Sequence, residues 1–152
     1  MGSDQPLWRM SATHALHAVF CLKAGIEERL SAAVGMLLAD NEALLHLAHS
    51  EGPLRMSDIA ERLVLSRGGT TKVIDRLEAI GLVERKPDPS DRRAMTVTIT
   101  DAGTAKLDES RGVVDAAIEE LWAAHITDEQ AAVVLEAMDS VLHGSFDCHP
   151  SR

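Results

Sequence analysis

Basic and hydroxyl side chains gather in one stretch of this chain of 152 residues. A first group consists of Ser66, Arg67, Thr70, Thr71, Lys72 and Arg76. A second group, Arg92-Arg93, lies in a segment that also holds two prolines and two aspartates. Guanidinium, ammonium and hydroxyl groups donate hydrogen bonds to phosphate oxygens and to the edges of bases. The stretch could therefore bind a nucleic acid if the fold presents both groups together.

Two short amphipathic helices are predicted to position the first group. Ser57 is predicted to cap the first helix, whose apolar side is formed by Ile59, Ala60 and Leu63. Val64-Leu65 make a turn, Ser66 is predicted to cap the second helix, and Gly81 is predicted to end it. The buried stripe of the second helix is predicted as Val73, Ile74, Leu77 and Ile80. The basic and hydroxyl residues then occupy its other faces, for which an ordinary surface helix is the alternative.

A hairpin with a long basic loop follows. Strands are predicted over Leu82–Lys86 and Met95–Thr100, and the second alternates apolar residues with threonines. A plain hairpin needs only a short turn, whereas a loop bearing Arg92 and Arg93 is typical of a wing, because arginine suits a narrow minor groove. Asp91 could hold one of these arginines in position. The pattern predicts a winged helix-turn-helix, with a solvated charged loop as the alternative for the wing.

Charge is unevenly distributed along the chain. The whole chain carries −9, with 15 basic and 24 acidic residues. Residues 52–100 hold nine basic and seven acidic residues, which leaves six basic and 17 acidic residues elsewhere. An acidic protein can bind DNA where its positive charge is local, and the acidic remainder confines the contact to that region.

The same stretch resembles the MarR family of bacterial transcription regulators, from about Asp40 to Leu107. The resemblance depends on three motifs, namely Asp75-Arg76-Leu77-Glu78 with Gly81-Leu82-Val83, then Asp91-Arg92-Arg93, then Ile99-Thr100-x-x-Gly103. It implies a mainly α fold with a small β-hairpin wing and with N- and C-terminal dimerisation helices. It also implies a homodimer that binds a pseudo-palindromic double-stranded DNA operator, with one recognition helix in each half-site.

By this resemblance, two sets of residues bind DNA. The major-groove or phosphate set is Ser66, Arg67, Gly69, Thr70, Thr71, Lys72 and Arg76, and the wing set is Arg92 and Arg93. Gly68-Gly69 departs from the family, which usually carries side chains in this first turn. Glycine has no base-reading group but lets the backbone approach a phosphate, so we expect the base readers later in the helix.

Helices are also predicted on both sides of this stretch. They cover Leu7–Lys23, Ile26–Leu38, a segment from a cap at Asp40 to about His49, Thr100 to about Ala124, and a last helix from the capping box Thr127–Gln130 to about Leu142. The last helix is expected to bury Val134, Leu135, Met138, Val141 and Leu142. The expected division is N-terminal dimerisation helices in residues 1–38, a DNA-binding lobe in 39–104 and C-terminal helices in 105–152. The three parts are expected to form one unit that is intertwined in a dimer with a large hydrophobic interface.

One side of the first helix carries Leu7, Met10, His14, His17 and Cys21. A packing stripe at the dimer seam is one interpretation, and the wall of an effector pocket is another. The candidate residues for such a pocket are Trp8, His14, His17, Cys21 and His46. Metal binding by His14 and His17 lacks a visible third ligand, and redox sensing by Cys21 lacks a nearby cation. We therefore expect no metal and no cofactor.

Several classes of protein are disfavoured. The sequence shows no apolar run of membrane-spanning length and no signal sequence, and its two cysteines, Cys21 and Cys148, make no disulfide framework. A cytoplasmic protein is therefore expected. No phosphate loop, catalytic carboxylate pair or nucleophile motif suggests an enzyme. The expected function is sequence-specific DNA binding by a homodimeric regulator, a repressor whose small-molecule effector favours wrongly spaced recognition helices. The alternative is a winged-helix protein-interaction module.

Overall fold

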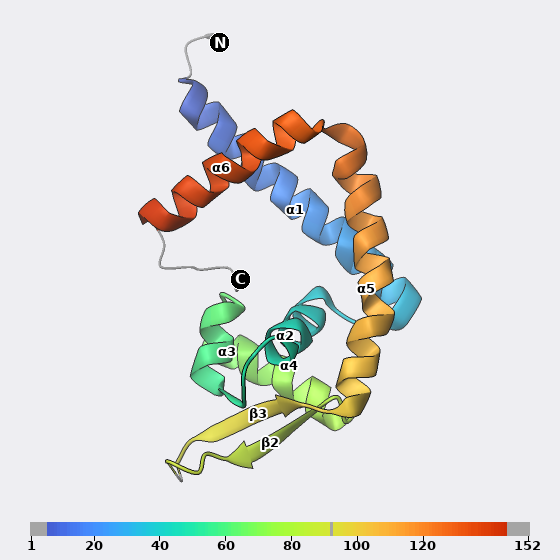
Figure 1. Cartoon of the computed structure of the whole chain (residues 1–152), viewed down its shortest axis with the longest axis vertical. Coiled ribbons are helices and arrows are strands. Elements are labelled where there is room, and N and C mark those ends of the chain that lie inside the picture. Colours follow the sequence, from blue (N-terminus) through green and yellow to red (C-terminus); the bar gives the residue numbers. More distant parts are fainter. Residues whose placement is uncertain (1–5, 92, 146–152) are drawn as a thin grey trace.

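The computed structural model describes residues 6–91 and 93–145 and is mainly helical (Figure 1). Its elements are α1 (Leu7–Val34), α2 (Leu38–Ala48), β1 (Leu54–Arg55), α3 (Met56–Arg62), α4 (Arg67–Ala79), β2 (Val83–Pro87), β3 (Met95–Ile99), α5 (Asp101–Leu121), the 3-10 turn η1 (Ala123–His125) and α6 (Asp128–Ser145). The predicted fold class is confirmed.

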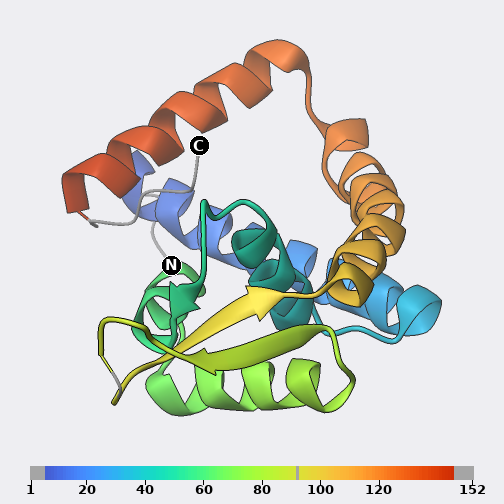
Figure 2. The same ribbon diagram turned by 60° about the horizontal axis from the view of Figure 1, so that its bottom comes forward.

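Helices α2, α3 and α4 and the three strands form a winged lobe with its own core. The strand order is β1-β3-β2, and both pairings are antiparallel. Figure 2 shows the long strands running beside α4. The most deeply buried side chains of this core are Leu44, Ile59, Ile74, Leu77 and Val97, each exposed by 1% or less. The lobe therefore closes its core without a second chain.

Helix α1 is one continuous helix, so the predicted break between Lys23 and Ile26 is wrong. The glycine at that point, Gly25, serves packing: a Cβ there would lie 2.6 Å from Cδ1 of Leu121 on α5. A second cluster consequently joins α1 to α5 through Ile26, Leu30, Leu38 and Ala117. This cluster attaches the long outer helices to the winged lobe.

Local capping signals correctly predicted several helix ends. Gly81 follows α4 with φ of 75°, a conformation that glycine adopts without steric cost. The Thr100 hydroxyl accepts from the Gly103 N–H at the start of α5. Thr127 and Gln130 satisfy each other's backbone N–H groups before α6, as expected for a capping box.

Two predicted caps are wrong. Ser57 lies inside α3, which begins at Met56, and the Asp58 carboxylate accepts from the Arg55 N–H instead. Asp40 lies inside α2, which begins at Leu38, and its buried carboxylate contacts another helix.

Helix α6 lies at the opposite side of the molecule from the sheet (Figures 1 and 2). Its apolar side chains remain exposed: Leu135 by 63%, Val141 by 50% and Met138 by 39%. No element within residues 6–91 and 93–145 covers these three side chains, so the prediction that the helix buries them is wrong for a single chain. Val134 and Leu142 are half-buried. The first half of α1 is similar, since Leu7, Trp8 and Phe20 are each exposed by 65% or more.

Candidate nucleic-acid interface

Helix α4 is positioned by its cap and by one buried side. The Ser66 hydroxyl accepts a hydrogen bond from the Gly69 N–H at 3.1 Å, which confirms the predicted cap. The buried stripe is Thr70, Val73, Ile74 and Leu77. Ile80 was predicted as its last member, but it lies beyond the end of the helix and is 63% exposed. The buried stripe leaves the opposite side of α4 facing solvent.

Three predicted DNA ligands lie on that solvent side. Arg67, Thr71 and Lys72 all have exposed side chains. The Thr71 hydroxyl donates to the Arg67 carbonyl at 2.9 Å, so its oxygen can still accept a hydrogen bond. Arg67 and Thr71 also line a hollow of about 310 Å³ together with Met56 and Ser57 from the start of α3. Basic and hydroxyl groups thus meet where α3 and α4 begin.

The prediction that Thr70 contacts DNA is wrong. Its side chain is 1% exposed, and its hydroxyl donates to the Ser66 carbonyl at 3.1 Å. Thr70 belongs to the core. The backbone N–H of Gly69 donates to the Ser66 hydroxyl. A phosphate that approaches this first turn would therefore have to bind a group other than the Gly69 N–H. Gly68 is exposed, and a Cβ at Gly68 would meet no atom within 4 Å.

Arg76 pairs with a carboxylate of the same chain, although its own side chain is 40% exposed. Its guanidinium donates to both carboxylate oxygens of Asp40 on α2, including an Nε–Oδ2 bond of 2.9 Å. Asp40 is buried, with 5% exposure. The hydrogen bond to Asp40 raises the pKa of the Arg76 guanidinium above its usual value. The Arg76 guanidinium is thus already hydrogen-bonded to Asp40. Direct contact between Arg76 and DNA stays a prediction.

The loop between β2 and β3 is held at its base by Asp88. This carboxylate accepts from the N–H and hydroxyl of Ser90 at 2.8 and 2.7 Å and from Nε of Arg55 at 2.7 Å. The hydrogen bonds from Ser90, followed by that from Arg55, lower the pKa of Asp88 to about 2. Asp91 accepts from the backbone N–H of Arg93 at 3.0 Å, so it shapes the turn through the main chain. Arg93 is exposed, and Arg92 lies outside the residues that the structure describes.

Residues 52–100 form a basic region with nine cations, and four of the eight that the structure describes form ion pairs within the fold. The ion pairs are Arg55–Asp88, Arg76–Asp40, Arg85 with Asp75 and Glu78, and Lys86–Glu84. The exposed cations of the same region include Arg62, Arg67, Lys72 and Arg93. Composition alone could not divide the cations in this way, because Asp88 lies 33 residues from Arg55 and Asp40 lies 36 residues from Arg76.

The candidate effector residues lie on two helices. Trp8, His14, His17 and Cys21 are all exposed on α1, and the His14 Nδ1 lies 2.7 Å from the Met10 carbonyl oxygen. His46 is half-buried on α2, where burial, and then the charge of Arg62, lowers its pKa. Whether these side chains share a pocket stays a prediction.

The described part of the chain holds no group of three or more histidine, cysteine, aspartate or glutamate side chains placed to bind a metal ion. Among the helices within residues 6–91 and 93–145, none is long and apolar enough to cross a membrane.

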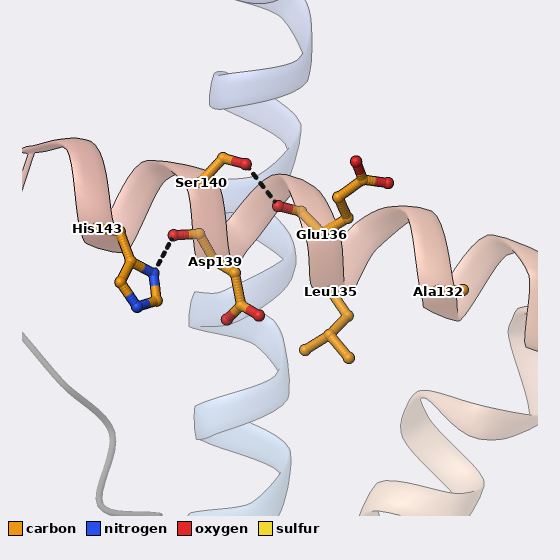
Figure 3. A pocket seen from close by; sticks show the side chains of 6 residues that line it. All are labelled: Ala132, Leu135, Glu136, Asp139, Ser140 and His143. Carbon is orange, nitrogen blue, oxygen red and sulfur yellow. Dashed lines mark hydrogen bonds between the residues drawn. The ribbon is translucent and has the colours of Figure 1, made fainter.

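A hollow of about 560 Å³ lies along α6, lined by Ala132, Leu135, Glu136, Asp139, Ser140 and His143. Figure 3 shows Leu135, Asp139 and His143 directed to the same side of the helix. All six of these residues lie on α6.

Residues 43–95, which cover most of the winged lobe, match the model of the MarR family. YkoM of Bacillus subtilis (strain 168), an uncharacterized HTH-type transcriptional regulator, is 32% identical over 101 residues. That alignment covers 66% of this chain and 66% of YkoM, just under two thirds of the length of that relative. The chain belongs to the MarR family. The resemblance seen in its sequence motifs is thereby confirmed.

Solved MarR structures share the fold over almost the whole chain. Sco3205, a MarR family transcriptional regulator from Streptomyces coelicolor in complex with DNA, superimposes with a TM-score of 0.82. It is 26% identical, and the match covers 94% of this chain and 92% of Sco3205. CouR from Rhodococcus jostii RHA1, bound to p-coumaroyl-CoA, superimposes with a TM-score of 0.78 at 22% identity. The match covers 97% of this chain and 100% of the CouR chain. The outer helices of this MarR chain are thus part of the shared fold.

Proposed function

We propose that this MarR-family chain is a homodimeric transcriptional regulator that binds a pseudo-palindromic double-stranded DNA operator. The observation that carries the proposal is the solvent side of α4, where Arg67, Thr71 and Lys72 are exposed opposite a fully buried stripe. The wing adds the exposed Arg93, and Arg92 is assigned to it by the family motif. Ser66 and Gly69 complete the proposed set at the start of the helix. The related Sco3205 is in complex with DNA, which supports DNA binding by a chain of this fold.

Dimerisation is proposed from the outer helices. Large apolar side chains on α6 and on the first half of α1 are exposed in the single chain. Large apolar side chains that remain exposed in a single chain favour association, and a two-fold dimer would present one α4 to each half-site. The division into residues 1–38, 39–104 and 105–152 is retained as part of this proposal, with the three segments acting as one intertwined unit.

A small-molecule effector is proposed to control the regulator as a repressor. Its pocket would lie between the dimerisation helices and the winged lobe, with Trp8, His14, His17, Cys21 and His46 as candidate contacts. CouR, which shares the fold, is bound to p-coumaroyl-CoA, so this architecture can hold an organic ligand. The effect of the ligand is limited by its differential affinity for the two arrangements of the recognition helices.

The proposed role of the chain is to bind DNA, without catalysis and without a cofactor. Its proposed location is the cytoplasm, where a bacterial regulator meets DNA. The relatives support it, since YkoM and Sco3205 are both described as transcriptional regulators.

Selection from random duplexes, followed by footprinting, tests the proposal. The expected footprint has two protected half-sites about 34–36 Å apart. Replacing Arg92 and Arg93 together with alanine is expected to weaken operator binding, whereas a protein-interaction module would be indifferent to the change. A selection that enriches no sequence, or a footprint with a single protected patch, would contradict the proposal.

A further inference from the structure

The first turn of α2 is hydrogen-bonded to three other helices. The Leu38 N–H donates to Oε2 of Glu27 on α1 at 2.6 Å. The Asp40 carboxylate accepts two hydrogen bonds from Nε and one from Nη2 of Arg76 on α4. The next residue, Asn41, accepts through Oδ1 from the hydroxyl of Ser110 on α5. Helices α1, α4 and α5 therefore meet through polar contacts at one turn.

Three of the side chains in these contacts are buried, whereas the Arg76 side chain is 40% exposed. Asp40 is 5% exposed, Asn41 7% and Ser110 0%. Buried polar groups of this kind hold a defined geometry, because a displaced partner leaves a donor or acceptor without water to replace it. A carboxylate that binds a planar guanidinium through two oxygens also fixes the direction of the arginine, as well as its distance.

Arg76 connects this junction to the proposed DNA-binding surface. It lies nine residues after Arg67 on the same α-helix, a separation of about 13.5 Å along the axis at 1.5 Å per residue. The pair with Asp40 therefore fixes the second half of α4, while Arg67, Thr71 and Lys72 lie on the first half. A change in the direction of Arg76 would turn or tilt the helix that carries the proposed DNA ligands.

We infer that Asp40 and Arg76 are positioning residues, which fix the recognition helix α4 relative to α1 and α5 and so set the spacing of the two recognition helices in the dimer. This inference rests on the proposed DNA-binding function. It differs from the sequence prediction for Arg76, in which the guanidinium itself contacts DNA.

Removing the charge of Asp40 distinguishes the two roles. Asp40→Asn deletes a negative charge beside the recognition helix and releases Arg76. If Arg76 contacts DNA, the change strengthens or preserves operator binding. If the pair positions α4, operator affinity falls, and we expect a loss of about tenfold or more, which corresponds to about 1.4 kcal/mol.

The matched control is Glu42→Gln. Glu42 lies on the same helix and has a carboxylate 3.9 Å from Nζ of Lys23, with no part in the Arg76 contact. Glu42→Gln removes one negative charge, as Asp40→Asn does, but it leaves the Asp40–Arg76 pair intact. Operator affinity is therefore expected to stay nearly unchanged or to rise slightly. Equal effects of Asp40→Asn and Glu42→Gln would overturn the inference.

Arg76→Gln and the double variant complete the cycle. Positioning predicts that the double variant binds no worse than either single variant, because all three break one pair. It also predicts an unchanged dependence of affinity on salt, since no phosphate contact is lost. A salt dependence that falls in Arg76→Gln but not in Asp40→Asn would assign Arg76 to DNA and overturn the inference.

Asp40→Glu keeps all charges of the chain and provides a second test in case Asp40→Asn does not fold. Asp40→Glu retains the carboxylate but lengthens it by one methylene, so positioning predicts weaker operator binding with unchanged thermal unfolding and dimer mass. Direct contact of Arg76 with DNA predicts no loss.

A measurement without DNA separates this inference from the proposed function. Thr71→Cys, in a chain with both native cysteines replaced by serine, places one spin label on each α4 of the full-length dimer. Asp40→Asn is expected to shift or broaden the distance distribution between the two labels, while Glu42→Gln leaves it unchanged. Identical distributions would overturn the positioning role. A wild-type protein that binds no operator would instead overturn the proposed function, and the label distances would still decide the role of the pair.

Discussion

The winged lobe and the outer helices bury their apolar side chains to very different extents. In the lobe, Ile59, Ile74 and Val97 have no measurable exposure, and each lies in the core of the lobe, to which α5 adds Leu107. On α6, Leu135 and Val133 are exposed by 63% and 66%. The lobe therefore encloses a core, although Val64 and Ile80 at its surface are exposed by 76% and 63%. On α6, no element within residues 6–91 and 93–145 covers the exposed apolar side chains.

This difference separates two tasks. A closed core holds α4 and the wing in one arrangement, which suits a surface that must match a rigid duplex. Helices with an open apolar side suit association, because burial of about 25 cal/mol per Å² of apolar surface favours a second copy. The comparison therefore predicts that apolar-to-charged changes affect assembly on α6 and leave it intact on the lobe.

The largest effect is expected from Leu135→Glu. A charge in a buried interface without a partner costs about 3 kcal/mol or more, so the dissociation constant of the dimer should rise by about 100-fold or more. Ile80→Glu is the matched control, since Ile80 is also 63% exposed but lies at the end of α4 in the lobe. Sedimentation of both variants over a range of concentrations measures the effect. Equal dimer dissociation constants for the two variants would contradict the division between lobe and outer helices.

The next effect concerns the packing of α5 against the lobe. A Cβ at Gly103 would lie 2.1 Å from the Leu82 carbonyl oxygen and 2.7 Å from Cγ1 of Ile99. Gly103→Ala is therefore expected to lower the free energy of unfolding by about 2–3 kcal/mol, because the backbone of Leu82 must move.

Gly112→Ala on the same helix provides the comparison for Gly103→Ala, since a Cβ there would meet no atom within 4 Å. It is expected to raise the free energy of unfolding by about 0.5–1 kcal/mol. Denaturant unfolding at one fixed protein concentration measures both variants, because the stability of a dimer depends on concentration. Equal changes in the two variants would show that Gly103 has no special place in the packing.

A smaller effect is expected from Gly68→Ala in the first turn of α4. The site is exposed and open, so the added Cβ should stabilise the helix by about 0.5–1 kcal/mol. If DNA approaches the backbone closely at this turn, the same variant will bind the operator more weakly despite its greater stability. Calorimetric unfolding and operator titration of the same sample separate the two effects. Greater stability with unchanged affinity would show that the glycine is not needed for DNA to approach.

The smallest effect concerns pH. Burial, together with the nearby charge of Arg62 and His49, lowers the pKa of His46 below its ordinary value. The neutral form is favoured in the folded lobe, so its contribution to stability is present above the ordinary pKa of about 6.5 and is lost as pH falls through the lowered pKa. NMR titration of the His46 imidazole is expected to give a midpoint below the ordinary histidine value of about 6.5. A midpoint at or above that value would show that the lobe does not desolvate this ring.

Sequence reasoning predicted best those features that depend on neighbouring residues. The Ser66, Thr100 and Thr127 caps and the positive φ of Gly81 follow from local hydrogen bonds and sterics, and all four were correct. The burial of Thr70 had a usable signal as well. Thr70, Val73, Ile74 and Leu77 follow the i, i+3, i+4, i+7 spacing of one helix face, but the hydroxyl favoured an interpretation as a DNA ligand.

Features that join distant segments could not be predicted in the same way. Arg76 and Asp40 are 36 residues apart, and Arg55 and Asp88 are 33 apart. Strand β1 has two residues and exists because it pairs with β3, so no local pattern identifies it. The assignment of cations to DNA or to internal pairs depends on such contacts, and this is the part of the interface that required the structure.

The salt dependence of operator binding by the wild type and by Lys72→Ala tests the central claim most directly. Each phosphate contact contributes about −0.9 to the slope of log K against log salt concentration. A dimer that places Lys72 of each chain against a phosphate should therefore lose about two units of slope in the variant, while Lys86→Ala, which removes a cation already paired with Glu84, should lose almost none. A loss of about one unit would indicate that a single recognition helix binds, and an unchanged slope in Lys72→Ala would contradict the assignment of α4 to the DNA.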